Sequence, residues 1–395
     1  GNNMTPAAVA AVEEARKYTS SIIRLPRSTC HFYPEGAFED NSLSVSNNGS
    51  GNRSIVFPLY NCHGITIDGE GSELFFHGRV SPFIIDHSSD ITIRNVNIDC
   101  KRPFYTQGLI LDSSNSFVEL KIDREEFPYK IENGDFLPYS HEWSIDTDTG
   151  MLMIEFNPQT KAPQHNGYFN LARLSGNTKP HPSEWFSENT TVITAAELSP
   201  YTIRLEANFK KVYRKGNILV ITHGSRKDSA FVINESSNTL IESVNIYHIG
   251  GMGVIAQLSD SVTCRNLQVR LREGTSRILS TNADATHFVN CTGKITLEDC
   301  IFENMNDDGT NIHGISTPVL RIVSNDTIEV GLNHHEQHGV NIYKAGDKIN
   351  VLARNSLLSK GRAVVELSEL VDPGCIRLQF EDDISGLITQ EDALD

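Results

Sequence analysis

One short phrase recurs along this chain and limits its fold more than any other feature. Each copy has a polar turn, alternating β-branched residues, a break at Asn or Asp, and a second short strand. The copies lie at residues 61–69, 88–99, 237–246, 259–269 and 290–302. In a parallel solenoid, like residues stack at the strand spacing of ~4.8 Å, so a repeated phrase is expected. A β-sandwich would explain the alternation but not the recurring Ile-Thr-Ile and Asn-x-x-Ile. The sequence therefore predicts an all-β chain built on a parallel β-helix.

Two stretches interrupt the repeat. From residue 108 to 222, and again from residue 315 onward, the pattern changes to longer strands with turns between them, and one expected hairpin spans residues 144–156. Both stretches are typical of small antiparallel β-barrels inserted between coils. The predicted organisation is a cap and first coils at 1–107, an insertion at 108–225, coils at 226–314 and a second insertion at 315–395. Because an open solenoid edge invites pairing with other chains, we expect further coils after Asp395 in a longer protein.

The chain opens with a helix signal. Thr5 is expected to cap the helix, Pro6 to occupy its first position, and Ala-rich sequence runs to about Lys17. Strands at about 22–26 and 31–33 follow. A short helix in this place would cover the open end of a solenoid core, although an ordinary surface helix fits the same pattern.

Charge and composition narrow the range of partners and compartments. The formal net charge is −16, so phosphate backbones are repelled and nucleic acid is not expected as a partner. The seven cysteines include no CxxC pair and predict small buried side chains rather than a zinc site or a disulfide framework. No apolar run reaches the ~20 residues of a membrane span. Gly1 resembles a cloning remnant, and we expect a periplasmic, secreted or cell-surface protein whose signal peptide lies outside this sequence.

The stretch from Thr281 to Gly314 holds the candidate site. Asp284 stands among small polar residues, a strand-like segment follows at 295–302, and Asp307 and Asp308 come next, before Gly309. Two adjacent strand residues face opposite sides, so the Asp-Asp-Gly sequence is expected at a turn where the glycine supplies an unusual φ. Three carboxylates one coil apart are the constellation expected of an enzyme that hydrolyses glycosidic bonds. Clustered carboxylates cannot all ionise readily, so one is expected to hold its proton near neutral pH.

Residues 282–287, Asn-Ala-Asp-Ala-Thr-His, and 303–314, Glu-Asn-Met-Asn-Asp-Asp-Gly-Thr-Asn-Ile-His-Gly, resemble the active-site region of the glycoside hydrolase family 110 α-galactosidases. The resemblance extends over nearly the whole chain, except that family members continue with further coils. It implies a right-handed parallel β-helix interrupted by two small antiparallel β-barrels. It also implies an exo-acting, inverting enzyme that removes terminal α-1,3-linked galactose, with a galactose-terminated glycan as its partner and no cofactor.

The resemblance implies Asp307 as the acid and Asp284 with Asp308 as the pair that activates water, although Asp307 and Asp308 could exchange roles. Inverting hydrolysis needs such an acid and base on opposite faces of the sugar. Asn282, His287, Asn311 and His313 are candidate ligands of galactose hydroxyls, or else turn and stacking residues. Asn290 and Asn304 fit structural positions in β-helix turns. No metal is expected, because a neutral galactoside carries no carboxylate that needs neutralising.

Several alternatives stay open at this point. His334, His335 and His338 form an HHxxH cluster, which we interpret as exposed histidines of an insertion loop rather than a metal site. A polygalacturonase or lyase on the same solenoid would need basic residues along its groove, and Arg272, Arg277 and Lys294 are the few candidates. A non-catalytic glycan-binding solenoid would not need three clustered Asp residues. The sequence leaves open whether the substrate is branched blood group B antigen or a linear glycan, and whether the protein is a homodimer.

Overall fold

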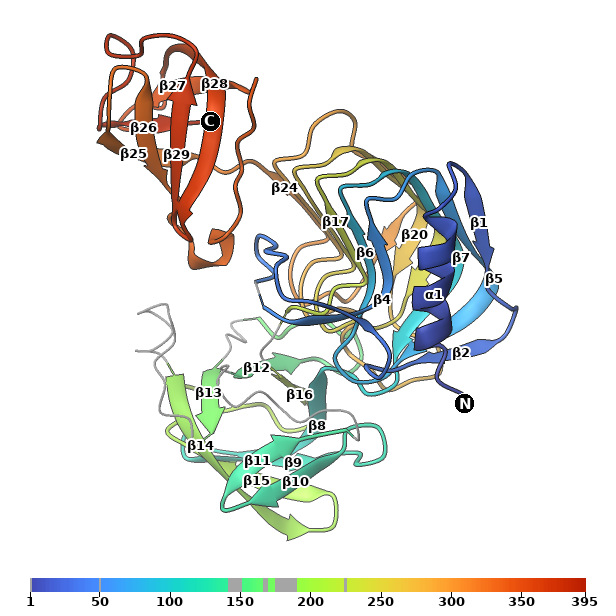
Figure 1. The fold of residues 1–395 in the computed structure, drawn as a ribbon. Helices are drawn as coiled ribbons and strands as arrows, with labels where there is room; N and C mark the ends of the chain where they lie inside the picture. The colour runs from blue at the N-terminus through green and yellow to red at the C-terminus, as the bar shows by residue number, and fades with distance from the viewer. Residues whose placement is uncertain (1, 50, 141–150, 166–169, 175–189, 224–225) are drawn as a thin grey trace.

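The computed structural model of the chain describes residues 2–49, 51–140, 151–165, 170–174, 190–223 and 226–395. These residues form a stack of parallel coils and two closed β-barrels, one inserted within the coils and one following them (Figure 1). The predicted fold class, a parallel β-helix interrupted by two antiparallel barrels, is confirmed.

Two long sheets make up the coils, and in both of them most strands pair in parallel with the preceding and following coil. The first sheet contains β1 (Ser21–Arg24), β2 (Thr29–Phe32), β5 (Ile65–Phe76), β7 (Ser89–Cys100), β18 (Ser237–Ile246), β20 (Asp260–Val269), β22 (Thr296–Glu298) and β23 (Ile301–Phe302). The second contains β3 (Phe38–Asp40), β4 (Arg53–Tyr60), β6 (Ser81–Asp86), β17 (Phe231–Asn234), β19 (Val254–Gln257), β21 (Thr286–Val289) and β24 (Thr310–His313). We call the second the site sheet. Only β3 in it runs antiparallel to its neighbour.

The recurring sequence phrase corresponds to the first sheet, and its copies stack in register. Thr66 pairs with Thr92, and Leu240 pairs with Thr92 and with Thr263. The polar break marks a left-handed corner in four of the copies, with serine in place of Asn or Asp in one: Asn95, Ser243, Asn266 and Asp299 have φ of 59°, 55°, 49° and 53°. Short polar side chains tolerate this conformation better than β-branched ones do. Asp299 also divides the strand expected at 295–302 into β22 and β23.

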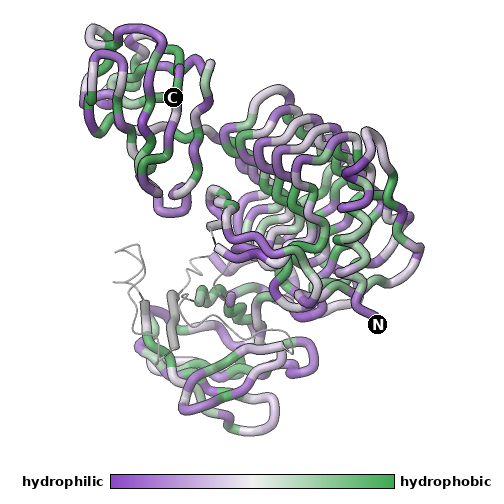
Figure 2. Tube along the Cα trace, viewed as in Figure 1, coloured by the Kyte–Doolittle hydropathy of each residue, from purple (hydrophilic) through white to green (hydrophobic). Residues whose placement is uncertain are grey.

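Apolar side chains of successive coils fill the space between the two sheets. Phe57, Phe83 and Phe231 stack in adjacent coils, with ring centroids 4.6 and 4.9 Å apart. Hydrophobic and hydrophilic residues alternate along the coils, as the period of a strand requires (Figure 2). The cysteines stay unpaired, and five of the seven are buried as small apolar side chains.

Helix α1 (Thr5–Ala15) covers the N-terminal end of this core. Its buried face contributes Ala8, Val12 and Ala15 to the core of the coils. The expectation that Thr5 caps the helix is wrong. Met4 precedes the first turn without a side-chain cap, whereas the Thr5 hydroxyl donates to the carbonyl of Tyr33 and accepts from its amide. The hydroxyl ties the helix to the chain beyond β2 instead of to its own turn.

The first barrel leaves the coils after β7 and returns before β17. Its strands are β8 (Tyr105–Ser113), β9 (Phe117–Lys121), β12 (Met151–Phe156), β13 (Asn170–Leu174), β14 (Thr190–Ser199), β15 (Thr202–Glu206) and β16 (Ile218–Thr222), with a hairpin of β10 (Tyr129–Glu132) and β11 (Asp135–Pro138). Ile278 and Leu279 of the coils pack into its core. The hairpin predicted at 144–156 lies partly outside the described residues, which resume with β12.

The second barrel follows the last described coil. It contains β25 (Thr317–Ile322), β26 (Thr327–Gly331), β27 (Lys348–Ala353), β28 (Ser359–Asp372), β29 (Cys375–Phe380) and β30 (Asp392–Leu394), and the 3₁₀ helix η1 (His335–Gln337) lies between β26 and β27. Val289 of β21 packs into its core, so the barrel is anchored on the coils. Segment 41–49, between β3 and β4, reaches from the early coils to this barrel. There the backbone amide of Asn47 donates to the Glu336 carbonyl at 3.2 Å.

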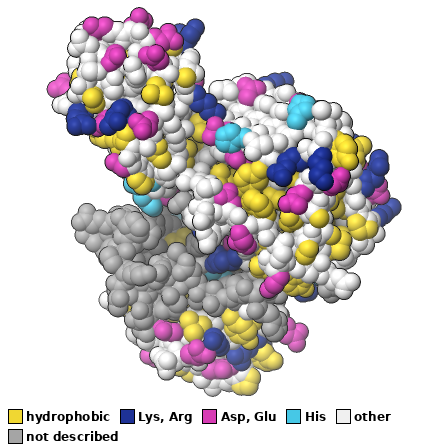
Figure 3. Space-filling view, in the orientation of Figure 1, with side chains coloured by type: hydrophobic (Ala, Val, Ile, Leu, Met, Phe, Trp, Pro, Cys, Tyr) yellow, Lys and Arg dark blue, Asp and Glu magenta, His cyan; other side chains and the backbone are white. Residues whose placement is uncertain are grey.

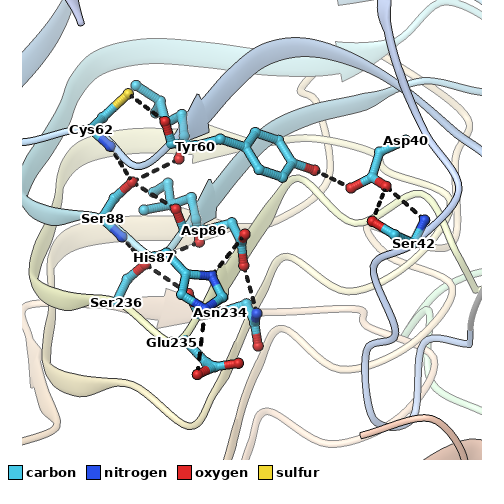
Figure 4. Close-up of polar contacts among 12 residues, drawn as sticks. Asp40, Ser42, Tyr60, Cys62, Asp86, His87, Ser88, Asn234, Glu235 and Ser236 are labelled. Atoms are coloured by element: carbon cyan, nitrogen blue, oxygen red, sulfur yellow. Dashed lines mark hydrogen bonds and ion pairs between the residues drawn. The ribbon is translucent and has the colours of Figure 1, made fainter.

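A ladder of polar side chains joins the ends of β6, β17 and β19 in the site sheet. Figure 4 shows its first contact, between Asp86 and Asn234. The side-chain amide of Asn234 donates to the Asp86 carboxylate at 2.6 Å, and the side-chain amide of Gln257 donates to Oδ1 of Asn234 at 2.7 Å. Gln257 also holds segment 41–49, because it donates to the Ser44 carbonyl and accepts from the Ser46 amide. We call Asp86, Asn234 and Gln257 the amide ladder.

Candidate active site

The three aspartates lie where the last two described strands of the site sheet begin. Thr286 of β21 pairs with Thr310 of β24, so Asp284 and Asp308 occupy equivalent positions on neighbouring coils. The backbone confirms this alignment, because the Ala285 amide donates to the Asp308 carbonyl at 2.9 Å. Asp307 precedes Asp308 in the same bend. The fold therefore places three carboxylates together at one end of two adjacent strands.

The role expected for Gly309 is wrong. Gly309 is not among the glycines with positive φ, and a Cβ at this position would meet no atom within 4 Å. The left-handed residue of this coil is Asn304, with φ of 61°. Asn304 turns the chain before the aspartates are reached, so both aspartates fit in an ordinary bend that does not require glycine.

Asp307 is more exposed than Asp284. Its carboxylate lies 3.1 Å from the Arg226 guanidinium, and its side chain is 41% exposed. Partial burial raises the pKa of the Asp307 carboxyl, Arg226 opposes the rise, and the charges of Asp284 and Asp308 add to it. A carboxyl with a raised pKa in contact with water can act as a proton donor.

Asp284 is buried, with 3% of the residue exposed. Its carboxylate lies 2.7 Å from Nδ1 of His287, in a hydrogen-bonding contact. Nε2 of His287 lies 2.9 Å from Nε2 of His313 and 3.1 Å from the side-chain amide nitrogen of Asn47. His313 contacts the Gly314 carbonyl through its Nδ1 at 2.9 Å. Asp284 is thus the first member of a chain of polar groups that ends at the partly exposed His313.

The other residues predicted from the sequence lie around these carboxylates in different ways. His287 is 2% exposed and is engaged with protein groups. Asn282 is 6% exposed, and its amide nitrogen donates to the Phe104 carbonyl at 2.8 Å. Asn311 pairs with His287 in the β21–β24 register. Asn290 and Asn304 occupy left-handed corners, as expected of structural residues.

Sequence reasoning missed the residues that come from outside the 281–314 stretch. Arg226 precedes β17, and Asn47 lies in segment 41–49. Buried Arg53 joins these two regions by donating to the carbonyls of Gly49 and Lys227. Asn48 adds a second link, from its amide to the Arg226 carbonyl at 2.6 Å. One signal was present in the sequence: a Cβ on Gly251 would lie 2.2 Å from the Arg226 carbonyl, so the Gly250-Gly251 pair marks a close backbone approach.

Among the described residues, no group of three or more His, Cys, Asp or Glu side chains is arranged to hold a metal ion. His334, His335 and His338 are exposed, and their segment is joined to the site through the Glu336 carbonyl and Asn47. In the space-filling view, acidic, basic and histidine side chains appear where the coils face the barrels (Figure 3). The arrangement suits acid and base chemistry on a polar molecule.

Comparison with known proteins places both barrels in defined families. Residues 106–219 match GLAA-B beta-barrel domain I, and residues 327–394 match GLAA-B beta-barrel domain II. The chain is therefore a parallel β-helix protein that carries the two GLAA-B barrels. Along most of its length it is similar to the α-1,3-galactosidases A and B.

Three curated relatives illustrate this similarity. Alpha-1,3-galactosidase A of Shewanella woodyi is 32% identical over 89% of this chain and 55% of the relative. Alpha-1,3-galactosidase B of Bacteroides thetaiotaomicron is 25% identical over 93% and 59%, and that of Akkermansia muciniphila is 26% identical over 99% and 46%. The chain thus spans about half the length of these relatives. No helix among the described residues is long and apolar enough to cross a membrane.

Proposed function

We propose that the chain carries the catalytic site of an exo-acting, inverting α-1,3-galactosidase. Relatives named as α-1,3-galactosidases match along most of its length. The observation that carries the proposal is the grouping of Asp284, Asp307 and Asp308 on two adjacent coils, where the pKa of Asp307 is raised. Its substrate is a glycan that ends in α-linked galactose, and its compartment is the periplasm, the cell surface or the medium.

The surroundings of Asp307 support the role proposed for it. Asp307 is the general acid, because partial burial raises the pKa of its carboxyl while its side chain stays in contact with water. Asp284 and Asp308 hold and activate the attacking water. The bond from the galactose anomeric carbon to the glycosidic oxygen breaks, and that oxygen takes the proton of Asp307. The water oxygen bonds to the opposite face of the same carbon and gives one proton to the carboxylate pair.

A galactosidase is favoured over an enzyme for acidic polysaccharides by the surroundings of two basic residues. Arg272 pairs with Glu73 and Asp99, and Arg277 pairs with Asp99 and Glu126. Both guanidiniums are held by carboxylates of the coils and the first barrel, so neither lines a groove for an anionic sugar. This supports a neutral substrate.

Release of galactose tests the proposal. The chain and a longer version with further C-terminal sequence would be incubated with an aryl α-galactoside, Galα1-3Gal, and branched blood group B trisaccharide. We expect free galactose from the α-1,3-linked substrates, and none from the Asp307→Asn variant with the natural disaccharide. If neither version releases galactose from any of the three, the proposal is wrong. The ratio of branched to linear cleavage also gives the preference that the sequence leaves open.

A further inference from the structure

His287 and His313 form a pair whose contacts define the number of protons they hold. The ring planes lie at 89°, and the rings meet edge to face through their Nε2 atoms at 2.9 Å. The remaining nitrogen of each ring faces a hydrogen-bond acceptor. Nδ1 of His287 faces the Asp284 carboxylate at 2.7 Å, and Nδ1 of His313 faces the Gly314 carbonyl at 2.9 Å. Every ring nitrogen of the pair is therefore in a hydrogen-bonding contact.

Three contacts need three protons. The Gly314 carbonyl can only accept, so Nδ1 of His313 carries a proton. Two bare nitrogens cannot face each other at 2.9 Å, so a second proton lies between the two Nε2 atoms. The contact between His287 and Asp284 needs a third, because a bare nitrogen would repel a carboxylate. Two neutral imidazoles supply only two protons. The group of Asp284, His287 and His313 therefore holds one proton more than a carboxylate and two neutral rings.

The extra proton could in principle lie on Asp284, with both rings neutral. Imidazole is more basic than a carboxylate by about two to three pK units in water, which favours the rings. Asn47 favours His313 within the pair, because its amide nitrogen is a donor aimed at Nε2 of His287. The single lone pair of that Nε2 then accepts from Asn47 and from His313 together, so Nε2 of His313 bears the proton. His313 is also the more exposed of the two rings, where a charge is better solvated.

We propose that His313 is an imidazolium in the resting protein and acts through His287 to keep Asp284 ionised. This rests on the proposed function, in which Asp284 belongs to the water-activating pair. The site then holds two cations that face different carboxylates: Arg226 on Asp307, and the histidine pair on Asp284. The charged group in contact with the pair is Asp284 before β21. Asp307 before β24 lies close enough to Asp284 for the two charges to interact. His287 and His313 are positioning residues that separate the base from the acid.

Nitrogen NMR tests the protonation directly and needs no activity. The whole chain would be labelled with ¹⁵N-histidine, and signals of the 14 histidines would be assigned by single substitutions, including His287→Gln and His313→Gln. At neutral pH we expect both nitrogens of His313 to be protonated and His287 to be a neutral ring with its proton on Nδ1. Two neutral rings would place the extra proton on Asp284 and overturn the proposal.

Kinetics tests the consequence. The acidic limb of the kcat/KM profile reports the ionisation of the base in the free enzyme. Loss of a neighbouring cation favours the protonated base, so His313→Gln should move this limb to higher pH by about one unit or more. His313→Lys keeps a positive charge and should move the limb back toward that of the wild type. A purely structural role would predict the same loss in both variants.

His63→Gln is the matched control, because His63 is an exposed histidine of the coils that contacts Asp90 and Ser89 away from the site. The acidic limb of the kcat/KM profile of His63→Gln should equal that of the wild type. If the wild type is active and His313→Gln leaves the acidic limb of the kcat/KM profile unchanged, the inference is wrong while the proposed function stands. A wild type that releases no galactose contradicts the proposed function, and the NMR result then decides the inference by itself.

Discussion

The outer face of the site sheet carries two polar clusters that balance their hydrogen bonds in different ways. In the amide ladder, Asp86, Asn234 and Gln257 alternate donors and acceptors from strand to strand, and each amide meets its partner within 2.7 Å. At the other end of the sheet, Asp284, Asp307 and Asp308 present carboxylates on two adjacent coils. The ladder lies on β6, β17 and β19, and the aspartates precede β21 and β24 of the same sheet. Both clusters stack at the strand spacing, but only the ladder has a neutral donor beside each acceptor.

The difference shows how one scaffold supports stability in one place and chemistry in another. An amide both donates and accepts, so a column of amides at strand spacing satisfies itself. A carboxylate only accepts, so a column of carboxylates repels itself unless cations approach from elsewhere. Arg226 reaches the site from before β17, and the histidine pair reaches it from β21 and β24. The remaining repulsion contributes to the raised pKa of Asp307.

The largest effect is expected from neutralising the carboxylates. Asp284→Asn, Asp307→Asn and Asp308→Asn should each lower kcat on Galα1-3Gal by about 10²- to 10⁴-fold, as loss of general acid or base catalysis does. An aryl galactoside with an acidic leaving group needs less protonation. The acid variant should therefore recover on that substrate, and the base variants should not. Near-normal activity in any one variant removes that residue from the mechanism, and recovery in Asp308→Asn would exchange the two roles.

Asp307→Asn should not destabilise the fold. The pKa of Asp307 is raised, so ionising it in the folded protein costs free energy. Stability is fully retained below the ordinary pKa of an aspartate and falls as the pH rises through the raised one. Asp307→Asn should thus melt at the same or a higher temperature than the wild type at neutral pH, with the difference vanishing in acid. A clearly lower melting temperature at neutral pH would mean that Asp307 has a structural role.

The amide ladder should respond in the opposite way. Asn234→Ala leaves Asp86 without an amide donor and Gln257 without an acceptor inside the sheet. Asp86 keeps its contact with His87 and Gln257 keeps the Ser44 carbonyl, so the free energy of unfolding should fall by about 1–3 kcal/mol in total. Turnover at a temperature where the variant is folded should stay within a few-fold of the wild type. Urea unfolding and initial rates measured on the same preparation check both expectations. A large loss of turnover with unchanged stability would join the ladder to the site.

Arg226→Gln should shift activity along the pH axis. Arg226 lowers the pKa of Asp307, so its removal allows that pKa to rise further. The acid is active while protonated, and the basic limb of the kcat/KM profile should therefore move to higher pH. Arg265→Gln is the control, because Arg265 pairs with Glu242 and Glu298 on the first sheet. A basic limb that moves to lower pH, or does not move, would separate Arg226 from the acid.

The smallest expected effect is that of chelation. An oxocarbenium-like transition state is itself positive, and a metal cation beside it would oppose its formation. Activity should therefore survive exhaustive EDTA treatment of the wild-type chain. Activity that disappears with EDTA and returns with calcium would favour a metal-dependent reaction at the same carboxylates.

The coils could be predicted from the sequence because a β-helix repeats its local chemistry. The corners at Asn95, Asn266 and Asp299 have a left-handed conformation that short polar side chains tolerate well, so Asn or Asp recurs at these three, and serine takes the equivalent corner at Ser243. The aspartates were found for a similar reason, since all three lie within two consecutive coils. Gly309 shows where prediction from neighbouring residues fails. Asn304 already supplies the left-handed corner of this coil, so Gly309 does not need a positive φ.

Long-range contacts explain what the sequence did not reveal. Arg226 meets Asp307 across 81 positions, and Asn47 meets His287 across 240. Neither pair leaves a periodic pattern, because each is made once, where a loop crosses the sheet. The same holds for Arg53, whose hydrogen bonds to Gly49 and Lys227 join two loops beside the site. Contacts that are made only once depend on how the coils and loops pack against each other, and this packing is visible only in the structure.

The stereochemistry of the released galactose tests the central claim most directly. If Asp284 and Asp308 hold water while Asp307 protonates the leaving oxygen, water attacks the face opposite the glycosidic bond. Proton NMR in the first minutes of turnover on Galα1-3Gal, before mutarotation, should then show β-galactose as the first product. Prompt appearance of α-galactose would mean that a carboxylate attacks carbon to form a covalent intermediate, and it would contradict the roles assigned to all three aspartates.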